Sequence, residues 1–380
     1  MATMRDVARV AGVSVGTVSN YVNAPGLVAP ATAARIRQAI ADLGYRVDVT
    51  ARAFSTGQTY TVGLVIPTIT NPYFAEIAGV VTHALWACGL QTFLCDAAAD
   101  PERERTHLQE LVARRVDGIL ISHSGEPGEL QRFAEQLTKP IVFFDRTVRG
   151  VHSVGADNRL GGRLAAAHLV GLGHRNVAVL AGDEGLANVR ERLDGFAEAL
   201  SQHGIELGGR HILCGPQTLE LGYRIGELLE REPRPTALFC TNDIVAIGAW
   251  RSLVELGYRV PEAISLIGFD DIEMSRLTVP ALTTVAQNKA AIGREASELL
   301  LRLMRGDQVA PNAIDIPPTL VVRGSTAAPD GVRVSPGASL YARDAHEPSR
   351  GAATVSDVTT APARRRRLRT GNTPGRRERR

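Results

Sequence analysis

The chain has 380 residues, of which 44% are hydrophobic and 22% charged, a balance typical of a globular protein with two or three domains. We expect a cytosolic protein, because the N-terminus has no secretory signal and no apolar run approaches the roughly 20 residues of a membrane span. The cysteines lie far apart, without a CxxC or Cys/His cluster, which argues against a zinc site and a disulfide framework. We predict reduced, mostly buried thiols at Cys88, Cys95, Cys214 and Cys240.

Charge is unevenly distributed along the chain. Residues 1–60 carry a net charge of +3, residues 61–326 carry −7 and residues 327–380 carry +7. Because polyanions bind to positive surfaces, any contact with a polyanion is expected at the two ends and not in the acidic body.

Residues 1–46 predict a small helical domain. Thr3 and Asp6 have the spacing of a capping box for a first helix, which a glycine can end. Ser14 can cap a second helix, and Pro30 suits the first position of a third. Two helices joined by a tight turn and braced by a third form a helix-turn-helix unit.

The second helix, in "GVSVGTVSNYVN" (12–23), carries small and hydroxylated residues where a solvated helix would carry Glu and Lys. A helix that enters the DNA major groove needs small side chains near the backbone, and hydroxyls or amides near phosphates and base edges. The pattern therefore predicts a DNA-reading helix. The expected phosphate contacts are Ser14, Thr17, Ser19 and Asn23, and the expected base contacts are Val15, Gly16 and Asn20.

Residues 61–326 alternate short apolar runs with helical stretches, a pattern typical of parallel strands buried on both faces of a sheet. Two series of four runs predict an α/β fold with two doubly wound parallel-sheet lobes. The runs are 61–67, 90–96, 118–122 and 140–145, then 176–182, 211–215, 237–243 and 265–271. A ligand is expected between the lobes at the carboxyl ends of these strands, where Asp96, Asp145, Asn242 and Asp270 stand.

Several segments follow one another in a specific order: "MRDVARVAGVSVGTVSNYVN", "TVGLVIPTITNPYFAEI", "RERLDGF", "TNDIVAIGA" and "SLIGFDDIEMSRLTVPALTTVAQ". Over about residues 3–326 the chain resembles the lactose/galactose repressor (LacI/GalR) family of bacterial transcriptional regulators. The resemblance implies a homodimeric repressor of a palindromic DNA operator. Its core would resemble a periplasmic sugar-binding protein and hold a small effector, a sugar, between two lobes. No metal, cofactor or catalytic group is expected.

The resemblance also assigns a role to the linker at residues 47–60. In the family this segment becomes a hinge helix on DNA, pairs with its dimer mate and wedges a leucine into a minor-groove step. The matching position is Phe54, a departure from leucine, beside Ala51 and Arg52. An apolar wedge there would kink the duplex. The alternative is a flexible linker with Phe54 packed on the core.

A second departure concerns specificity. This chain has Asn20 where the family usually has arginine. Asparagine pairs with adenine, whereas arginine pairs with guanine, so we predict adenine at that half-site position and a thymine methyl against Val15.

The effector residues that the resemblance implies combine aromatic rings, suited to a sugar face or a purine, with polar groups suited to hydroxyls. They are Tyr73, Phe74, Asp145, Arg190, Arg192, Asn242, Asp270 and Gln287. Gln217 stands where the family often has an aromatic residue, which favours a more polar ligand.

Two other classes of protein remain as alternatives. Against a cytosolic carbohydrate-acting enzyme, the sequence has no Gly-x-Gly-x-x-Gly after a strand, no Gly-x-Ser-x-Gly elbow and no Walker loop, and its 9 histidines lack metal-ligand spacing. Against a solute-binding receptor stand the missing export signal and the helix-turn-helix. The tail, residues 327–380, predicts a disordered basic segment, either one that adds nonspecific phosphate contacts or one that is merely solvated.

Overall fold

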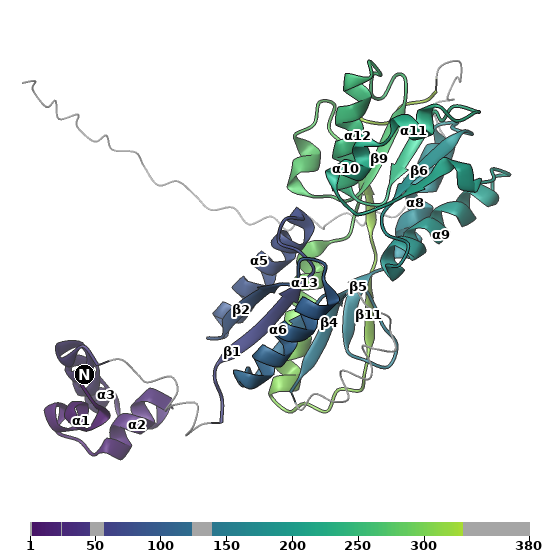
Figure 1. The fold of residues 1–380 in the computed structure, drawn as a ribbon. Coiled ribbons are helices and arrows are strands. Elements are labelled where there is room, and N and C mark those ends of the chain that lie inside the picture. Colours follow the sequence, from purple (N-terminus) through teal and green to yellow (C-terminus); the bar gives the residue numbers. More distant parts are fainter. Residues whose placement is uncertain (1, 24, 46–56, 124–138, 330–380) are drawn as a thin grey trace, which may run out of the picture. The chain divides into compact units, whose positions relative to one another are not determined.

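The computed structural model describes residues 2–23, 25–45, 57–123 and 139–329. They form an N-terminal group of three helices and two α/β lobes, coloured along the sequence in Figure 1. The predicted hinge residues Ala51, Arg52 and Phe54 and the tail from residue 330 lie outside the described residues, and the expectations about them remain predictions.

The N-terminal helices are α1 (Met4–Ala11), α2 (Val15–Asn23) and α3 (Pro30–Leu43), with a 3-10 turn η1 (Pro25–Leu27) between the last two. The predicted capping box is confirmed, because the Thr3 hydroxyl accepts from the Asp6 backbone N–H and the Asp6 carboxylate accepts from the Thr3 backbone N–H. The predicted Ser14 cap is also confirmed, with its hydroxyl accepting from Thr17 N at 3.0 Å. Val7, Val18 and Ile36 form the centre of the small core.

The first lobe contains a six-stranded parallel sheet in the order β11-β5-β4-β3-β1-β2. The strands are β1 (Thr61–Ile66), β2 (Gln91–Asp96), β3 (Gly118–Ile121), β4 (Ile141–Asp145), β5 (Ser153–Ala156) and β11 (Ala313–Ile316). The helices that pack on it are α5 (Pro72–Ala87), α6 (Pro101–Ala113) and α13 (Lys289–Met304).

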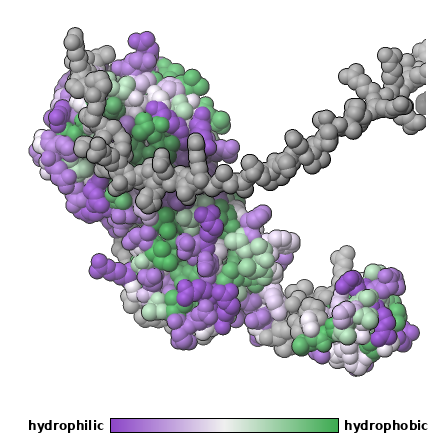
Figure 2. Space-filling model, turned by 180° about the vertical axis from the view of Figure 1, so that it is seen from behind, coloured by the Kyte–Doolittle hydropathy of each residue, from purple (hydrophilic) through white to green (hydrophobic). Residues whose placement is uncertain are grey.

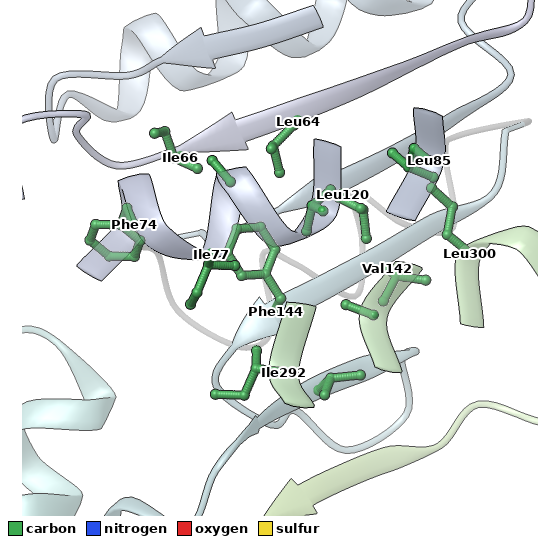
Figure 3. Close-up of a cluster of buried hydrophobic side chains, with 14 of the residues drawn as sticks. Leu64, Ile66, Phe74, Ile77, Leu85, Leu120, Val142, Phe144, Ile292 and Leu300 are labelled. Carbon is green, nitrogen blue, oxygen red and sulfur yellow. The ribbon is translucent and has the colours of Figure 1, made fainter. Parts of the chain in front are cut away.

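Alternate residues of the central strands fill two separate cores in the first lobe, because successive side chains of a strand point to opposite faces. One core combines Leu64, Leu120 and Phe144 with apolar residues of α5 and α13, as Figure 3 shows. The other combines Ile119 and Phe143 with residues of α6. Both faces of the sheet are therefore covered by helices.

The second lobe contains a six-stranded sheet in the order β12-β10-β9-β8-β6-β7, in which β12 is antiparallel to β10 and the other pairs are parallel. The strands are β6 (Val177–Ala181), β7 (Ile212–Cys214), β8 (Ala237–Cys240), β9 (Ser265–Asp270), β10 (Thr283–Ala286) and β12 (Thr319–Val321). The helices are α8 (Asn158–Gly171), α9 (Ala187–Ser201), α10 (Leu219–Tyr223), α11 (Gly226–Leu229) and α12 (Asp243–Glu255), with 3-10 turns η2 (Gly209–His211) and η3 (Glu273–Arg276).

The lobes differ from the prediction in strand number and in chain path. Each sheet has six strands instead of the predicted four. The additional strands β5, β10, β11 and β12 were not predicted, because they are only three or four residues long and lack a continuous apolar run. The lobes are also not consecutive in sequence, since α13 and β11 return to the first lobe after β10 of the second.

Two predictions about burial are wrong. Strand β2 lies at the edge of its sheet, so that Phe93 is 43% and Leu94 is 44% exposed instead of being buried on both faces. Of the cysteines, only Cys240 is buried, whereas Cys88 is exposed and the other two are half-buried.

Hydrophobic and hydrophilic residues are interspersed over the face of the molecule shown in Figure 2. Within the described ranges, no helix combines the length and the apolar character that crossing a bilayer requires.

Candidate DNA-reading helix and effector site

Helix α2 presents the predicted base-contacting residues to solvent. Val15, Gly16 and Asn20 are exposed, and Val15 is 42% exposed although it is apolar. Val18, which lies on the side of the helix opposite Gly16 and Asn20, is completely buried in the small core. The helix is therefore anchored through one face and offers small side chains on the other.

The predicted phosphate contacts occupy the start and one side of the same helix. Ser14 is exposed, and its hydroxyl lies 2.9 Å from that of the half-buried Thr17. Ser19 is half-buried, and Asn23 is the last residue of α2, with a side chain outside the described part. The Ser14 and Thr17 hydroxyls lie at the N-terminal end of α2, a position that suits phosphate oxygens.

A cavity of about 620 Å³ lies between the two lobes. The first lobe lines it with residues at the carboxyl ends of β1, β3 and β4, and the second lobe with the loops after β6 and β7 and the start of α9. This position agrees with the rule that places ligands of doubly wound sheets at the carboxyl ends of their strands. The lining residues include Thr68, Asn71, Phe74, His123, Asp145, Arg146, Asp183, Glu184, Leu186, Asn188 and Gln217.

Arg192 of α9 forms the centre of a buried polar network in the second lobe. Only 2% of the residue is exposed, and its guanidinium lies over the Phe269 ring at 3.9 Å from the centroid. Its Nε donates to Asn158 Oδ1 at 2.8 Å, and its Nη1 donates to the Thr241 carbonyl at 2.6 Å. Nη1 also pairs with Asp270 Oδ1 at 3.5 Å, so the buried cation has both a counter-ion and neutral acceptors.

The close crossing of α8 and α9 sets the position of Arg192. A Cβ on Gly162 would lie 2.0 Å from the Arg192 carbonyl oxygen, and a Cβ on Gly195 would lie 2.0 Å from the Arg159 carbonyl oxygen. Neither backbone could approach the other so closely with a side chain in between. The glycines of "LGGR" and "LDGF" are therefore required by packing.

The network continues into the first lobe. Gln287 Nε2 donates to Asp270 Oδ1 at 2.6 Å, and Gln287 Oε1 accepts from the Tyr73 hydroxyl at 3.2 Å. Burial raises the pKa of Asp270 to about 6, and nearby Arg192 and Lys289 keep it from rising further. Burial also raises the pKa of Tyr73 well above its ordinary value, so its hydroxyl remains a donor at neutral pH.

Asp145 connects this network to the cavity. Its backbone has φ 79°, a conformation rare for residues other than glycine, and its carboxylate is buried. Oδ2 lies 3.5 Å from both Ser122 Oγ and Asn188 Nδ2, the second of which belongs to the other lobe. Burial raises the pKa of Asp145, while Tyr73 and Arg192 limit the rise.

The remaining predicted residues are placed in different ways. Asn242 caps α12 by accepting from Val245 N at 2.8 Å, and its amide donates to the cavity residue Gln217. Arg190 is exposed and donates to the carbonyls of Glu184 and Gly185, at 2.6 and 2.8 Å, so it braces a loop of the cavity wall. Of the eight predicted effector residues, Phe74 and Asp145 line the cavity directly.

Comparisons with known proteins agree with this architecture. Residues 3–48 match the family described as bacterial regulatory proteins, lacI family, and residues 166–326 match a periplasmic binding protein-like domain. The chain is 38% identical over 331 residues to the HTH-type transcriptional repressor PurR of Haemophilus influenzae strain PittEE, covering 86% of this chain and 98% of that protein. This chain belongs to the lacI family. It is a DNA-binding transcriptional regulator.

Solved structures of lacI-family regulators share the fold. The lac repressor dimer bound to operator and the anti-inducer ONPF matches with a TM-score of 0.77 and 28% identity, over 86% of this chain and 99% of that chain. The transcriptional regulator CelR in complex with cellobiose matches with a TM-score of 0.65 and 31% identity, over 86% and 100%.

The sequence did not indicate three residues of this site: Asn188 and His123, which line the cavity, and Glu104, which is hydrogen-bonded to His123. Asn188 lies on the same helix as Arg192, one turn earlier, and this spacing could have indicated that it lies near the site. His123 lines the cavity directly after β3, and its ring is hydrogen-bonded to the buried Glu104 of α6. Their separation of 19 residues gives no local pattern, so the pair becomes visible only in three dimensions.

Proposed function

We propose that two copies of this chain bind a palindromic operator in the cytosol and repress transcription there. The exposed small-residue face of α2, which Val18 anchors from behind, is the single observation that carries the proposal. A two-fold operator needs two reading helices related by the same symmetry, hence a homodimer.

The proposal divides the chain into four regions. Residues 1–46 read the major groove, and residues 47–60 form the hinge that inserts Phe54 into the minor groove. Residues 61–326 bind the effector and dimerise. Residues 327–380 form a basic tail that adds nonspecific phosphate contacts.

Base recognition by α2 depends chiefly on Asn20 in this proposal. Its exposed amide can pair with N6 and N7 of adenine, and the exposed Val15 can contact a thymine methyl. Gly16 offers no side chain, so DNA shape contributes to specificity at the neighbouring positions.

The effector in this proposal is a sugar or a related polar metabolite that binds in the cavity between the lobes. The Phe74 ring offers an apolar surface, and carboxylate and amide groups around it match hydroxyls, which both donate and accept. The similar regulator CelR was solved with cellobiose, and a lacI-family regulator of Enterococcus faecium was solved with ribose. The protein releases its ligand chemically unchanged.

Footprinting on the DNA upstream of the chain's own gene, followed by fluorescence anisotropy, tests this function. We expect at least about 10³-fold tighter binding to the protected site than to random duplex at the same salt, and a change in that ratio when a sugar binds. Equal affinity for both duplexes, with and without sugars, would contradict the proposal.

The base preference has its own test. Asn20→Ala should remove the discrimination between adenine and the other bases at one half-site position, an effect of about 1–3 kcal/mol, while other positions keep theirs. Gln38→Ala, an exposed amide on α3, is the matched control. An unchanged base preference in Asn20→Ala would remove this residue from the recognition code.

A further inference from the structure

Asp117 holds the point where the end of the predicted hinge enters the first lobe. This residue directly precedes β3, and its carboxylate accepts from two successive backbone N–H groups. Oδ1 accepts from Thr59 N at 3.0 Å, and Oδ2 accepts from Tyr60 N at 2.6 Å. Because one rigid carboxylate meets two adjacent N–H groups, the bonds fix both the position and the direction of this stretch of backbone.

Further contacts hold the same two residues, which we call the entry segment (59–60). Thr59 Oγ1 donates to the Arg115 carbonyl at 3.1 Å, and the Tyr60 carbonyl accepts from Gln91 N at 2.9 Å. The Tyr60 side chain packs against the core of the first lobe. The entry segment is thus bound to the start of β2 and to the loop before β3, in addition to the Asp117 carboxylate.

The backbone of Tyr60 has an unusual conformation. Its φ of 57° lies in the left-handed region, which residues other than glycine rarely adopt. A residue stays in that region only where its surroundings hold it there, and such residues are concentrated at functional sites. The bonds from Asp117 and Gln91 hold Tyr60 in this conformation at the end of the predicted hinge.

The anchor lies far from the effector cavity. Strands β1 and β3 pair in parallel, with Val62 opposite Gly118, and the entry segment is at their amino ends. Pro67 and Ser122, directly after their carboxyl ends, line the cavity. The six residues of β1 span about 20 Å, so Asp117 is not placed to contact an effector. Its place is on the covalent path from the DNA-reading helix to the core.

Building on the proposed function, we infer that Asp117 is a positioning residue for operator binding. Its carboxylate fixes where, and in which direction, residues 1–58 leave the first lobe. In a dimer, two such anchors set one separation between the reading helices, and this separation must match the spacing of the half-sites. Asp117 acts through Thr59 and Tyr60 and does not itself contact DNA.

The size of the expected effect separates positioning from simple tethering. If residues 46–60 served only as a tether, release of the entry segment would lengthen it from 13 residues (46–58) to 15 (46–60). The effective concentration of a tethered group falls as about the −3/2 power of the tether length, so binding would weaken only about 1.2-fold. Loss of a fixed direction should cost more, and we expect about tenfold weaker operator binding.

Spacing discrimination, the ratio of the affinities for two operators, is the decisive measurement. Fluorescence anisotropy on the full chain compares the footprinted operator with the same operator carrying one extra base pair between its half-sites. The extra pair moves the half-sites about 3.4 Å apart and turns them by about 35°, so wild type should bind this operator at least about tenfold more weakly. Asp117→Ala should bind the native operator about tenfold more weakly than wild type does, and should discriminate between the two operators less than about threefold.

Asp157→Ala is the matched control. Asp157 is also a half-buried carboxylate that accepts from a backbone N–H, that of Leu160 at 2.8 Å, but it caps α8 in the second lobe. Both substitutions remove one negative charge, which favours binding to DNA, so weaker binding by Asp117→Ala would not come from charge. The control should keep the operator affinity and the spacing discrimination of wild type, and all variants should bind random duplex within about twofold of wild type.

Asp117→Asn keeps the size of the side chain and serves if Asp117→Ala does not fold. Its amide offers one acceptor oxygen and places an N–H donor against the second backbone N–H, so one of the two anchoring bonds is lost. Asp117→Asn should therefore also reduce the spacing discrimination, by about threefold or more.

The outcomes separate this inference from the proposed function. If an Asp117 variant is less stable in urea but keeps the operator affinity and spacing discrimination of wild type, the carboxylate only stabilises the lobe and the inference is overturned. If wild type binds the operator no more tightly than random duplex, the proposed function fails together with the inference.

Discussion

Replacing Arg192 with methionine should strongly destabilise the second lobe. Methionine has a similar length but no charge, so the substitution leaves Asn158 Oδ1 and the Thr241 carbonyl without the Arg192 donor. It also leaves the buried Asp270 carboxylate without its counter-ion, although Gln287 still donates to it. Removing one partner of a buried ion pair costs about 3–5 kcal/mol. The two acceptors that lose the Arg192 donor, at about 1–3 kcal/mol each, lead to a similar figure.

The loss should depend on pH. Asp270 has a folded pKa of about 6 against an ordinary value of 3.8, so the folded chain binds a proton there more readily than the unfolded chain. Its contribution to the free energy of unfolding therefore decreases as the pH rises from about 4 to 6. Without Arg192 the pKa of Asp270 rises further, and the loss should be larger at pH 8 than at pH 5.

Urea unfolding followed by tryptophan fluorescence measures this effect. The chain has two tryptophans, Trp86 in α5 and Trp250 in α12, so a Trp86→Phe background makes the signal specific to the second lobe. Arg163→Met, which removes a half-exposed guanidinium 3.9 Å from Glu198, is the control and should cost less than about 1 kcal/mol.

Adding Asp270→Asn to Arg192→Met should restore part of the stability, because the uncompensated buried charge is then gone. A loss below about 1 kcal/mol in Arg192→Met, or a greater loss in the double variant, would refute the assigned role of the ion pair.

Three further changes test other parts of the structure. Gly195→Ala should push α8 away from α9 and lower the free energy of unfolding of the second lobe by about 1–3 kcal/mol. The control Gly204→Ala, at an open loop position with φ 69°, should lower it by less. Equal losses of stability in the two variants would contradict the close crossing of the helices. Burial and neighbouring His174 lower the pKa of His168 to about 4 from 6.5, so the stability that neutral His168 contributes is complete above pH 6.5 and is lost as the pH falls toward 4. His168→Gln should reduce the change in the free energy of unfolding between pH 6.5 and 4 by up to about 3 kcal/mol. Parallel pH profiles of the variant and the wild type would contradict this role of His168. Deleting residues 331–380 should make the salt dependence of DNA binding less steep, and an identical slope would show that the tail makes no phosphate contacts.

The sequence predicted best what is decided locally. The Thr3–Asp6 capping box, the Ser14 cap and the helical bounds around them depend on residues three positions apart, and the structure confirms them. The central strands were also correctly located, since their apolar runs are long and buried on both faces.

Features decided by distant partners could not be predicted in this way. Arg190 and Arg192 lie about 200° apart around α9, so one braces an exposed loop while the other is buried, and the sequence offered both as ligand candidates. The short strands β5, β10, β11 and β12 are set by pairing with neighbours rather than by their own residues. Neither the edge position of β2 nor the His123–Glu104 pair leaves a local signal.

The return of α13 and β11 to the first lobe has a consequence for synthesis on the ribosome. Ile292, Leu299 and Leu300 of α13 complete the core against β3 and β4, so this core stays open while the nascent chain ends before residue 289. The second lobe likewise waits for β12 at residues 319–321. Neither lobe can therefore complete its fold until nearly all of residues 61–326 have been translated. A chain that ends earlier exposes apolar surface on both lobes, which chaperones or proteases can bind.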